Sequence, residues 1–123
     1  MDLRPDQALR RDQRGLSKLT AAVVLATAGS AAEADRIAEA LVAERLAACV
    51  QTTPIASRYV WKGELQKDEE VLLLIKTRRE LFEAVRTRIR ALHSYETPEV
   101  LMVEVAAGDA DYLAWLEAGT DGA

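Results

Sequence analysis

Two short, nearly continuous runs of apolar residues, 19–26 and 71–75, constrain the fold of this chain most strongly. Aliphatic runs of this length are typical of strands that are buried on both faces. A sheet that contains such strands must be covered on both sides, because large exposed apolar surfaces are rare in monomeric proteins. We therefore expect a layered fold in which helices cover one face of the sheet and a further surface covers the other.

Helical periodicity follows each of these runs. Apolar side chains recur at three- and four-residue spacing over residues 34–42 and again over 81–92. A capping-box pattern precedes each stretch, in which a hydroxyl and a carboxylate satisfy free backbone donors at a helix start. The two boxes are Ser30 with Glu33 and Thr77 with Glu80. The patterns predict one helix after each apolar run.

A long extended segment, residues 48–61, lies between the first helix and the second apolar run. Pro54 cannot donate to a strand ladder, so it marks a bulge, a bend or an edge strand. The turn signal Lys62-Gly63-Glu64 predicts a hairpin onto the strand at 71–77, with a charged tip over 62–70. The long segment would span ~46 Å at ~3.3 Å per residue, about twice the length of its partner. We expect its overhang to leave unpaired backbone groups that invite pairing with another copy.

A fourth apolar stretch at 100–105 and a short helix after Gly108 complete the order of elements. The fold class is therefore α+β: a ferredoxin-like β-α-β-β-α-β sandwich with a four-stranded antiparallel sheet, plus a C-terminal helix. Two helices cover only one face of such a sheet. We expect a closed homo-oligomer in which sister chains cover the rest.

Composition narrows the class of partner. The formal charge is −4 and the isoelectric point about 5.1, which argues against a nucleic-acid partner. No apolar stretch approaches the ~20 residues of a membrane-spanning helix, so no membrane partner is expected. The single cysteine, Cys49, is consistent with a reducing compartment, and we expect a cytoplasmic protein. The polar residues 1–18 are predicted to form a flexible tail before a domain at 19–119.

Five separated sequence blocks resemble the CutA family of divalent-cation tolerance proteins. The resemblance runs from about Leu19 to Trp115, which is most of the chain. The blocks are 46–50 (LAACV), Tyr59 with 61–64 (WKGE), Lys76-Thr77, His93 with Tyr95 and Pro98-Glu99, and Gly108 with Tyr112-Leu113 and Trp115. The resemblance implies a ferredoxin-like homotrimer held by strand pairing between subunits. It also implies a role in metal-ion tolerance and homeostasis, copper or another divalent metal as the bound ion, and no enzymatic reaction.

Three positions depart from the family pattern. Ala26 stands where some copper-binding members carry a second cysteine, which weakens a copper site directly. Gln51 stands where asparagine is usual, and Ser94 replaces a proline that is common after the histidine.

Cys49 and His93 are the candidate metal ligands, because a thiolate and an imidazole suit copper or zinc. Two ligands from one chain do not close a four-coordinate site, so other subunits would supply the rest. The alternative for Cys49 is a small buried apolar residue. The alternative for His93 is a helix-end side chain that caps carbonyls or faces solvent.

Six further residues are candidates for a ligand pocket or a subunit interface. They are Tyr59, Trp61, Lys76, Tyr95, Glu96 and Glu99. Tyr59 and Trp61 share one strand face and form either a pocket wall or an interface. Tyr95, Glu96 and Glu99 offer phenol and carboxylate oxygens near His93, but Glu99 can instead cap a turn and Tyr95 pack at an interface. Lys76 either extends out of the core or contacts an anion in a cleft.

The leading hypothesis is a metal-binding homotrimer without catalytic activity, since no nucleophile–base pair or phosphate-binding loop is readable. The second is a trimeric sensor, similar to the PII signalling proteins, that binds a small anionic ligand between subunits. The third is a trimeric scaffold that binds no ligand.

Overall fold

The computed structural model describes residues 20–122, so the predicted tail at 1–18 lies outside the described residues. The elements in chain order are β1 (Ala21–Ala28), α2 (Ala31–Ala43), β2 (Cys49–Trp61), β3 (Glu64–Arg78), a short 3-10 helix η1 (Arg79–Leu81), α3 (Phe82–Leu92), β4 (Val100–Glu104) and α4 (Ala110–Gly119). This order confirms the predicted succession of strands and helices.

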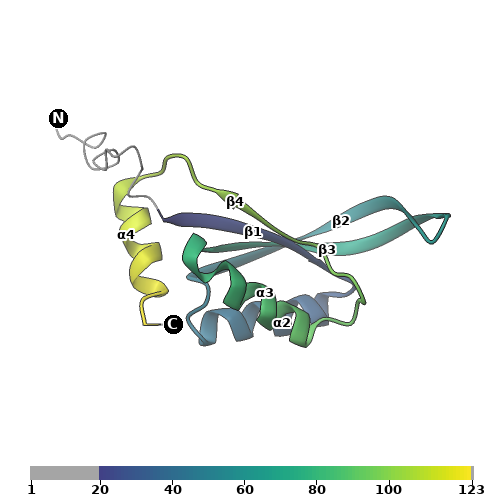
Figure 1. Ribbon diagram of the computed structural model, residues 1–123, viewed down its shortest axis with the longest axis horizontal. Helices are drawn as coiled ribbons and strands as arrows, with labels where there is room; N and C mark the ends of the chain where they lie inside the picture. Colours follow the sequence, from purple (N-terminus) through teal and green to yellow (C-terminus); the bar gives the residue numbers. More distant parts are fainter. Residues whose placement is uncertain (1–19, 123) are drawn as a thin grey trace.

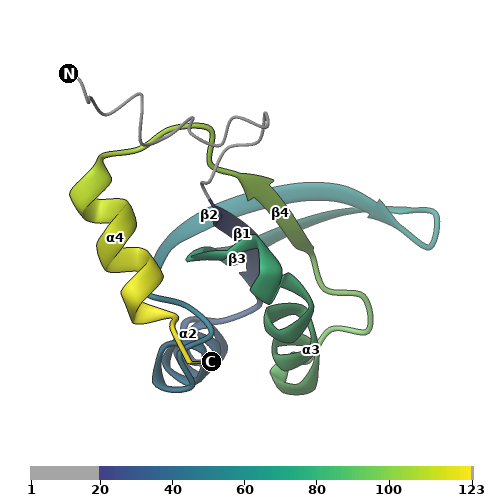
Figure 2. The same cartoon turned by 60° about the vertical axis from the view of Figure 1, so that its left-hand side comes forward.

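The four strands form one antiparallel sheet in the order β2-β3-β1-β4. The crossover from β1 to β2 runs through α2, and the crossover from β3 to β4 runs through α3. Both helices lie against the same face of the sheet (Figures 1 and 2). The predicted α+β class and sheet arrangement are confirmed.

The core lies between this face and the two helices. It is built from aliphatic side chains, because the aromatic residues are few. Its fully buried members include Val24 from β1, Ile37 and Leu41 from α2, Leu73 and Ile75 from β3, and Val85 and Ile89 from α3. Ala26, which stands where the resemblance implies a second cysteine in some copper-binding members, is also fully buried here and pairs opposite Leu73.

The opposite face of the sheet carries apolar side chains that α2 and α3 do not cover. Since side chains alternate along a strand, the cross-strand rows Leu101–Leu25–Leu74 and Val103–Val23–Lys76 share this second face. Leu101 and Val103 are more than half exposed. The expectation that two helices leave one apolar face open therefore holds for this subunit.

The β2–β3 hairpin differs from the prediction. Strand β3 begins at Glu64, and every residue of β2 pairs with it, from Cys49 opposite Lys76 to Trp61 opposite Glu64. The turn is only Lys62-Gly63, with φ of 53° and 81°, a left-handed conformation that glycine adopts without strain. The predicted charged tip at 62–70 and the unpaired overhang of residues 48–61 are therefore wrong. The charged residues before Val71 look like a loop in sequence but form a strand because β2 pairs with them.

The outer part of this hairpin projects beyond the helices (Figure 1). We call residues 55–70 the arm. The apolar side chains of Val60 and Leu65 in the arm are 67% and 75% exposed. Pro54, opposite Val71 in an unbroken register, lies at the base of the arm on the edge strand β2, so the edge alternative is the one observed.

The two predicted capping boxes have different outcomes. The Ser30 hydroxyl accepts a hydrogen bond from the Glu33 amide at 3.1 Å, so the first helix is capped as expected. The second box is wrong. Thr77 is a fully buried residue of β3 whose hydroxyl donates to the Leu46 carbonyl at 2.7 Å, and α3 is entered through η1 without a side-chain cap.

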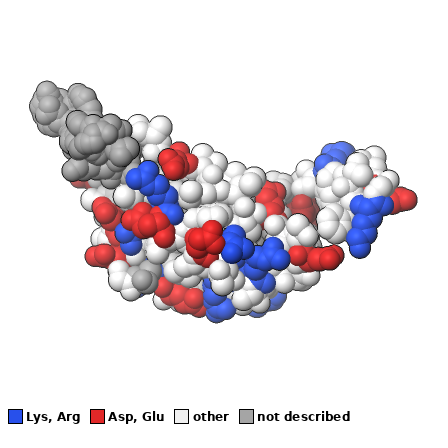
Figure 3. All heavy atoms as spheres, viewed as in Figure 1, with Lys and Arg blue, Asp and Glu red and all other residues white. Residues whose placement is uncertain are grey.

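Helix α4 lies at the end of the sheet opposite the arm (Figures 1 and 2). Asp109 caps its start by accepting from the Tyr112 amide at 3.1 Å. Two arginines hold its C-terminal end: Arg45 donates to the Ala118 carbonyl in the last turn and to the Asp121 carbonyl just beyond it, and Arg78 donates to the carbonyl of the C-cap residue Thr120. On the side shown in Figure 3, basic and acidic side chains interleave along the helices and at the arm, without one large field of either sign.

Candidate functional site

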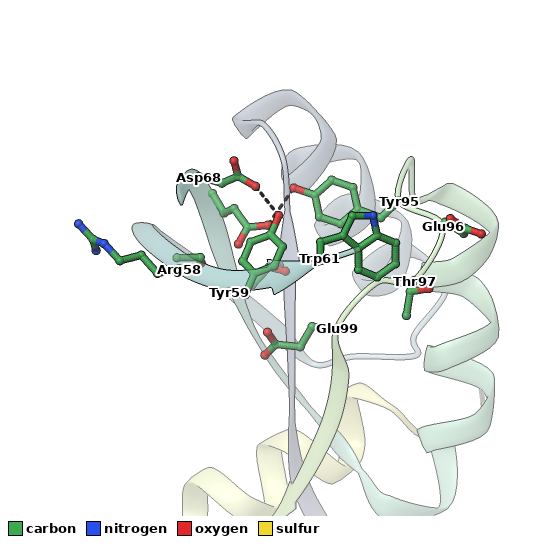
Figure 4. A pocket seen from close by; sticks show the side chains of 11 residues that line it. Arg58, Tyr59, Trp61, Asp68, Tyr95, Glu96, Thr97 and Glu99 are labelled. Carbon is green, nitrogen blue, oxygen red and sulfur yellow. Dashed lines mark hydrogen bonds between the residues drawn. The ribbon is translucent and has the colours of Figure 1, made fainter. Parts of the chain in front are cut away.

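A pocket of about 590 Å³ lies where the arm leaves the body of the sheet. Its walls come from β2, from β3, from the end of β1 and from the loop between α3 and β4, as Figure 4 shows. The lining residues are Thr27, Ser57, Arg58, Tyr59, Trp61, Asp68, Glu70, Tyr95, Glu96, Thr97 and Glu99. Five of the six predicted pocket or interface residues therefore meet in one place.

Tyr59 and Asp68 face each other across the arm. The Tyr59 hydroxyl donates a short hydrogen bond to the Asp68 carboxylate. This bond stabilises the protonated phenol and raises the pKa of Tyr59 above its ordinary value of 10.0. The pairing fixes the position of one aromatic side of the pocket.

Tyr95 and Glu70 form a second pair, deeper in the pocket. The Tyr95 hydroxyl donates to Glu70 Oε2 at 2.8 Å. Burial, followed by this bond to a carboxylate, raises the pKa of Tyr95 well above the usual phenol value. Gly29 permits the approach, because a Cβ at that position would lie 3.1 Å from the Tyr95 hydroxyl oxygen.

His93 anchors the loop that carries Tyr95. Its buried ring places Nε2 2.6 Å from the Thr27 carbonyl, and Nδ1 accepts from the Tyr95 amide at 3.0 Å. A carbonyl oxygen only accepts and an amide N–H only donates, so these partners assign the neutral tautomer with the proton on Nε2. Both ring nitrogens are therefore engaged in hydrogen bonds within the subunit.

Glu33 holds the same loop from helix α2. Its carboxylate accepts from the Ser94 amide at 2.6 Å, from the Ser94 hydroxyl at 3.1 Å and from the Gly29 amide at 3.4 Å. Burial opposes ionisation, but the hydrogen bonds from Ser94, with a smaller contribution from the Gly29 amide, outweigh it and lower the pKa of Glu33. A proline at position 94 would have neither donor, so this departure from the family pattern gives the loop two additional hydrogen bonds.

The two predicted metal ligands do not meet within one subunit. Cys49 is half-buried and lies opposite Lys76, whereas the His93 ring bonds to Thr27, which lies opposite Leu72. Four residues separate these positions along β3, which corresponds to ~13 Å. Among the residues that the structure describes, no group of three or more histidine, cysteine or acidic side chains is arranged to hold a metal ion.

Lys76 is the predicted pocket residue that lies elsewhere. Its ammonium donates to Gln51 Oε1 at 2.8 Å and lies 6.0 Å from the centre of the Tyr112 ring. Lys76 therefore belongs to the α4 end of the sheet, and the departure Gln51 is its hydrogen-bond partner.

The sequence reading missed Asp68 and Glu70 as pocket residues. Both fall within the charged hairpin tip that the sequence predicts over 62–70. Their two-residue spacing was the available signal, since it places them on one strand face opposite Ser57 and Ile55, on the same side as Tyr59. The signal becomes readable only once β3 is known to begin at Glu64.

Comparison with known proteins identifies the family. The model of the CutA1 divalent ion tolerance protein family matches residues 22–119. The chain belongs to this family. The CutA divalent-cation tolerance protein of Thermus thermophilus is 46% identical over 99 residues, covering 80% of this chain and 96% of the relative. That of Yersinia pestis is 42% identical over 114 residues, covering 92% and 96%.

Solved CutA structures show the same fold. The CutA structure from Xylella fastidiosa matches with a TM-score of 0.81 at 38% identity, covering 83% of this chain and 99% of the other. A structure described as the periplasmic divalent cation tolerance protein CutA from Archaeoglobus fulgidus matches with a TM-score of 0.81 at 36% identity, covering 82% and 99%. The resemblance to the CutA family is thus confirmed, and the family names point to a tolerance protein rather than a catalyst. Within residues 20–122, no helix combines the length and apolar character needed to cross a bilayer.

Proposed function

We propose that this CutA-family chain contributes to divalent-metal tolerance by binding metal cations in the pocket at the base of the arm. The charge of the pocket carries the proposal. Four carboxylates, those of Asp68, Glu70, Glu96 and Glu99, line it together with a single guanidinium from Arg58. The Arg58 side chain points away from the phenols in Figure 4. A pocket with this balance attracts cations.

The donor atoms favour hard metal ions over copper. Carboxylate and phenol oxygens suit Mg²⁺, Ca²⁺ or Mn²⁺, whereas thiolate suits Cu(I). The only thiol, Cys49, lies outside the pocket. Copper, the ion implied by the family resemblance, would bind by way of Cys49 only if other copies of the chain supplied the remaining ligands.

The working form we propose is a homotrimer. Its support is the apolar face that α2 and α3 leave open, together with the outer edge of β2, which has no strand beside it among residues 20–122. Neighbouring copies would cover this face and complete the coordination that one described subunit lacks. Light scattering on the eluting protein tests this directly, and a monomer at micromolar concentration contradicts it.

Calorimetric titration with Mn²⁺ and Cu²⁺ tests the metal site. Glu96→Gln combined with Glu99→Gln should weaken Mn²⁺ binding while the oligomer stays intact. Cys49→Ser is the matched control for the pocket and should change Cu²⁺ binding alone. If the double variant binds Mn²⁺ like the natural sequence, the pocket is not the metal site.

A sensor of small anions, similar to the PII proteins, is the second candidate. The sensor hypothesis uses five residues of this chain. Four of them line the pocket, namely Tyr59, Trp61, Tyr95 and Glu99, but Lys76 lies outside it. The excess of carboxylates disfavours an anion. A rise in melting temperature with ATP or organic acids, and none with metals, would favour the sensor. A flat response to both series would favour the scaffold reading.

The cytoplasmic location and the absence of catalysis belong to the same proposal. The support for a non-catalytic role is the family name, and the support for location is the single cysteine. Fractionation of cells that produce the full chain measures the location. Recovery in an extracytoplasmic fraction would contradict it.

A further inference from the structure

The pocket at the base of the arm combines three aromatic rings with carboxylates, a combination that metal binding does not require. We propose that it binds a small organic cation, such as a methylated ammonium or a guanidinium compound. Tyr59, Trp61 and Tyr95 would contact the cation with their rings, and Glu70 and Asp68 would neutralise its charge. This inference goes beyond the proposed metal binding and does not depend on it.

Glu70 is the first reason. This residue is only 8% exposed, and it lines the pocket. Its Oε2 accepts from the neutral Tyr95 hydroxyl, and no basic side chain within residues 20–122 forms an ion pair with it. Burying a carboxylate is costly unless a cation compensates the charge. A cationic ligand in the pocket would supply that compensation.

The aromatic walls are the second reason. The Tyr59 hydroxyl points to the Asp68 carboxylate, as a dashed line in Figure 4 shows. The Tyr95 hydroxyl donates to the Glu70 carboxylate. Both hydroxyl groups therefore donate their protons to carboxylates within the pocket. Trp61, at 42% exposed, supplies the largest ring of the pocket. Cations held near aromatic faces are stabilised by the ring quadrupoles, and tryptophan is the strongest such partner.

The dimensions are the third reason. A volume of about 590 Å³ is in the range of pockets that bind small organic molecules. A bare metal ion fills only a small part of such a space. The described residues also lack a cluster of three ligands that would fix an ion at one point. Aromatic rings and separated carboxylates recognise an extended organic cation without such a cluster.

Calorimetric titration of the full-length protein with choline tests the charge requirement. Its uncharged counterpart of the same shape, 3,3-dimethylbutan-1-ol, is the matched ligand, and methylguanidinium is the second cation. We expect binding of at least one cation and roughly tenfold weaker binding of the alcohol, from the lost cation–aromatic and ionic attraction.

Two pairs of variants locate the site. Trp61→Leu should weaken binding of the cation about tenfold, whereas Trp115→Leu, which alters a similarly exposed tryptophan on α4, should leave it unchanged. Glu70→Gln keeps the acceptor for Tyr95 but removes the charge, so it should also weaken binding. Its control, Glu69→Gln, changes the exposed neighbour on the other strand face. Light scattering must give the same oligomer for all four variants. If Trp61→Leu alters the oligomer, the comparison of Glu70→Gln with Glu69→Gln tests the inference instead.

Three results would overturn the inference: neither cation binds, the alcohol binds as tightly as choline, or both pocket variants bind like the natural sequence. The first result would also follow if a lysine or arginine of a sister chain occupied the pocket. A parallel Mn²⁺ titration separates this inference from the proposed metal function. Binding of choline without binding of Mn²⁺ would remove only the metal proposal, and binding of Mn²⁺ without binding of either organic cation would remove only this inference.

Discussion

The β2–β3 hairpin passes through two environments, and the same ladder of hydrogen bonds has a different role in each. In the body of the sheet, Leu73 and Ile75 are fully buried beneath α2 and α3. In the arm, Val60 and Leu65 belong to the same pair of strands but are mostly exposed. Backbone pairing is continuous across both parts, so side-chain burial alone distinguishes them.

The stability of the subunit resides in the body rather than in the arm. An isolated two-stranded hairpin is marginally stable in water, because its hydrogen bonds replace bonds to water and it buries little apolar area. The body supplies the burial and holds the base of the arm. The arm is then free to expose aromatic and acidic side chains that the core would not accept. The candidate site lies at the junction of the two parts, where the loop from α3 meets the arm.

The largest expected effect comes from truncating one leucine in each environment of β3. Leu73→Ala should lower the free energy of unfolding by about 2–5 kcal/mol, because it leaves a cavity in the core. Leu65→Ala should change it by less than about 1 kcal/mol in the subunit, because its side chain is already exposed. Urea unfolding at one fixed protein concentration measures both.

Comparable losses in the two variants would mean that the arm contributes to stability as much as the body does. If the loss in Leu65→Ala depends on protein concentration, a sister chain covers Leu65, since the stability of an oligomer varies with concentration. A loss independent of concentration would instead show that the arm is part of the subunit core.

The next effect concerns the loop that joins the body to the pocket. Glu33→Ala should cost about 1–3 kcal/mol, because the Ser94 and Gly29 donors lose their acceptor in a buried setting. Glu39→Ala, an exposed glutamate of the same helix, should be nearly neutral. Chemical unfolding at neutral pH gives both values.

The stability that Glu33 contributes should depend on pH. The pKa of Glu33 is lower in the folded protein than its ordinary value of 4.5, so the folded state favours the carboxylate. Its contribution is therefore complete above 4.5 and is lost as the pH falls through the folded pKa. The stability gap between the natural sequence and Glu33→Ala should narrow in acid. A gap that stays constant would mean that the charge of Glu33 does not matter.

The body of the sheet could be predicted from the sequence, whereas the arm could not. Body elements follow from apolar periodicity, which is why the order of elements and the core strands were predicted correctly. The arm lacks that signal. Residues 64–70 are polar and form a strand only because β2 pairs with them, so the extent of β3 and the positions of Asp68 and Glu70 were missed.

The candidate site was likewise predictable only where its residues lie close together in the sequence or on one strand face. Five of the candidate residues line one pocket, and the sequence could group them because they lie in short blocks near one another or share a strand face. They are Tyr59, Trp61, Tyr95, Glu96 and Glu99. The roles of Thr77 and Glu33 needed tertiary contacts. Both residues belong to capping-box patterns. The Thr77 hydroxyl is buried in the sheet and donates to Leu46, whereas the Glu33 carboxylate accepts from Ser94, which lies 61 residues later in the chain. A local pattern does not encode either partner.

A smaller effect is expected at the far end of the body, where Arg78 holds α4. Its guanidinium donates to the Thr120 hydroxyl at 2.8 Å and to the Thr120 carbonyl at 2.9 Å. Arg78→Ala should cost about 1 kcal/mol and speed amide hydrogen exchange in α4 selectively. Arg79→Ala is the control, because its ion pair with Glu104 is 3.7 Å long and exposed. Uniformly faster exchange over the whole chain would contradict a local role.

The smallest effect is expected for the exposed phenol of the arm. Asp68→Asn removes the charge that accepts the Tyr59 hydroxyl proton, while the asparagine oxygen can still accept. The thermal midpoint should not change measurably, because the pair lies outside the buried core. The pKa of Tyr59 should fall back toward 10.0, which an ultraviolet titration of the phenols resolves when it is compared with Tyr59→Phe. An unchanged titration in Asp68→Asn would mean that the two side chains do not meet in solution, and a lowered midpoint would mean that the arm stabilises the fold as the body does.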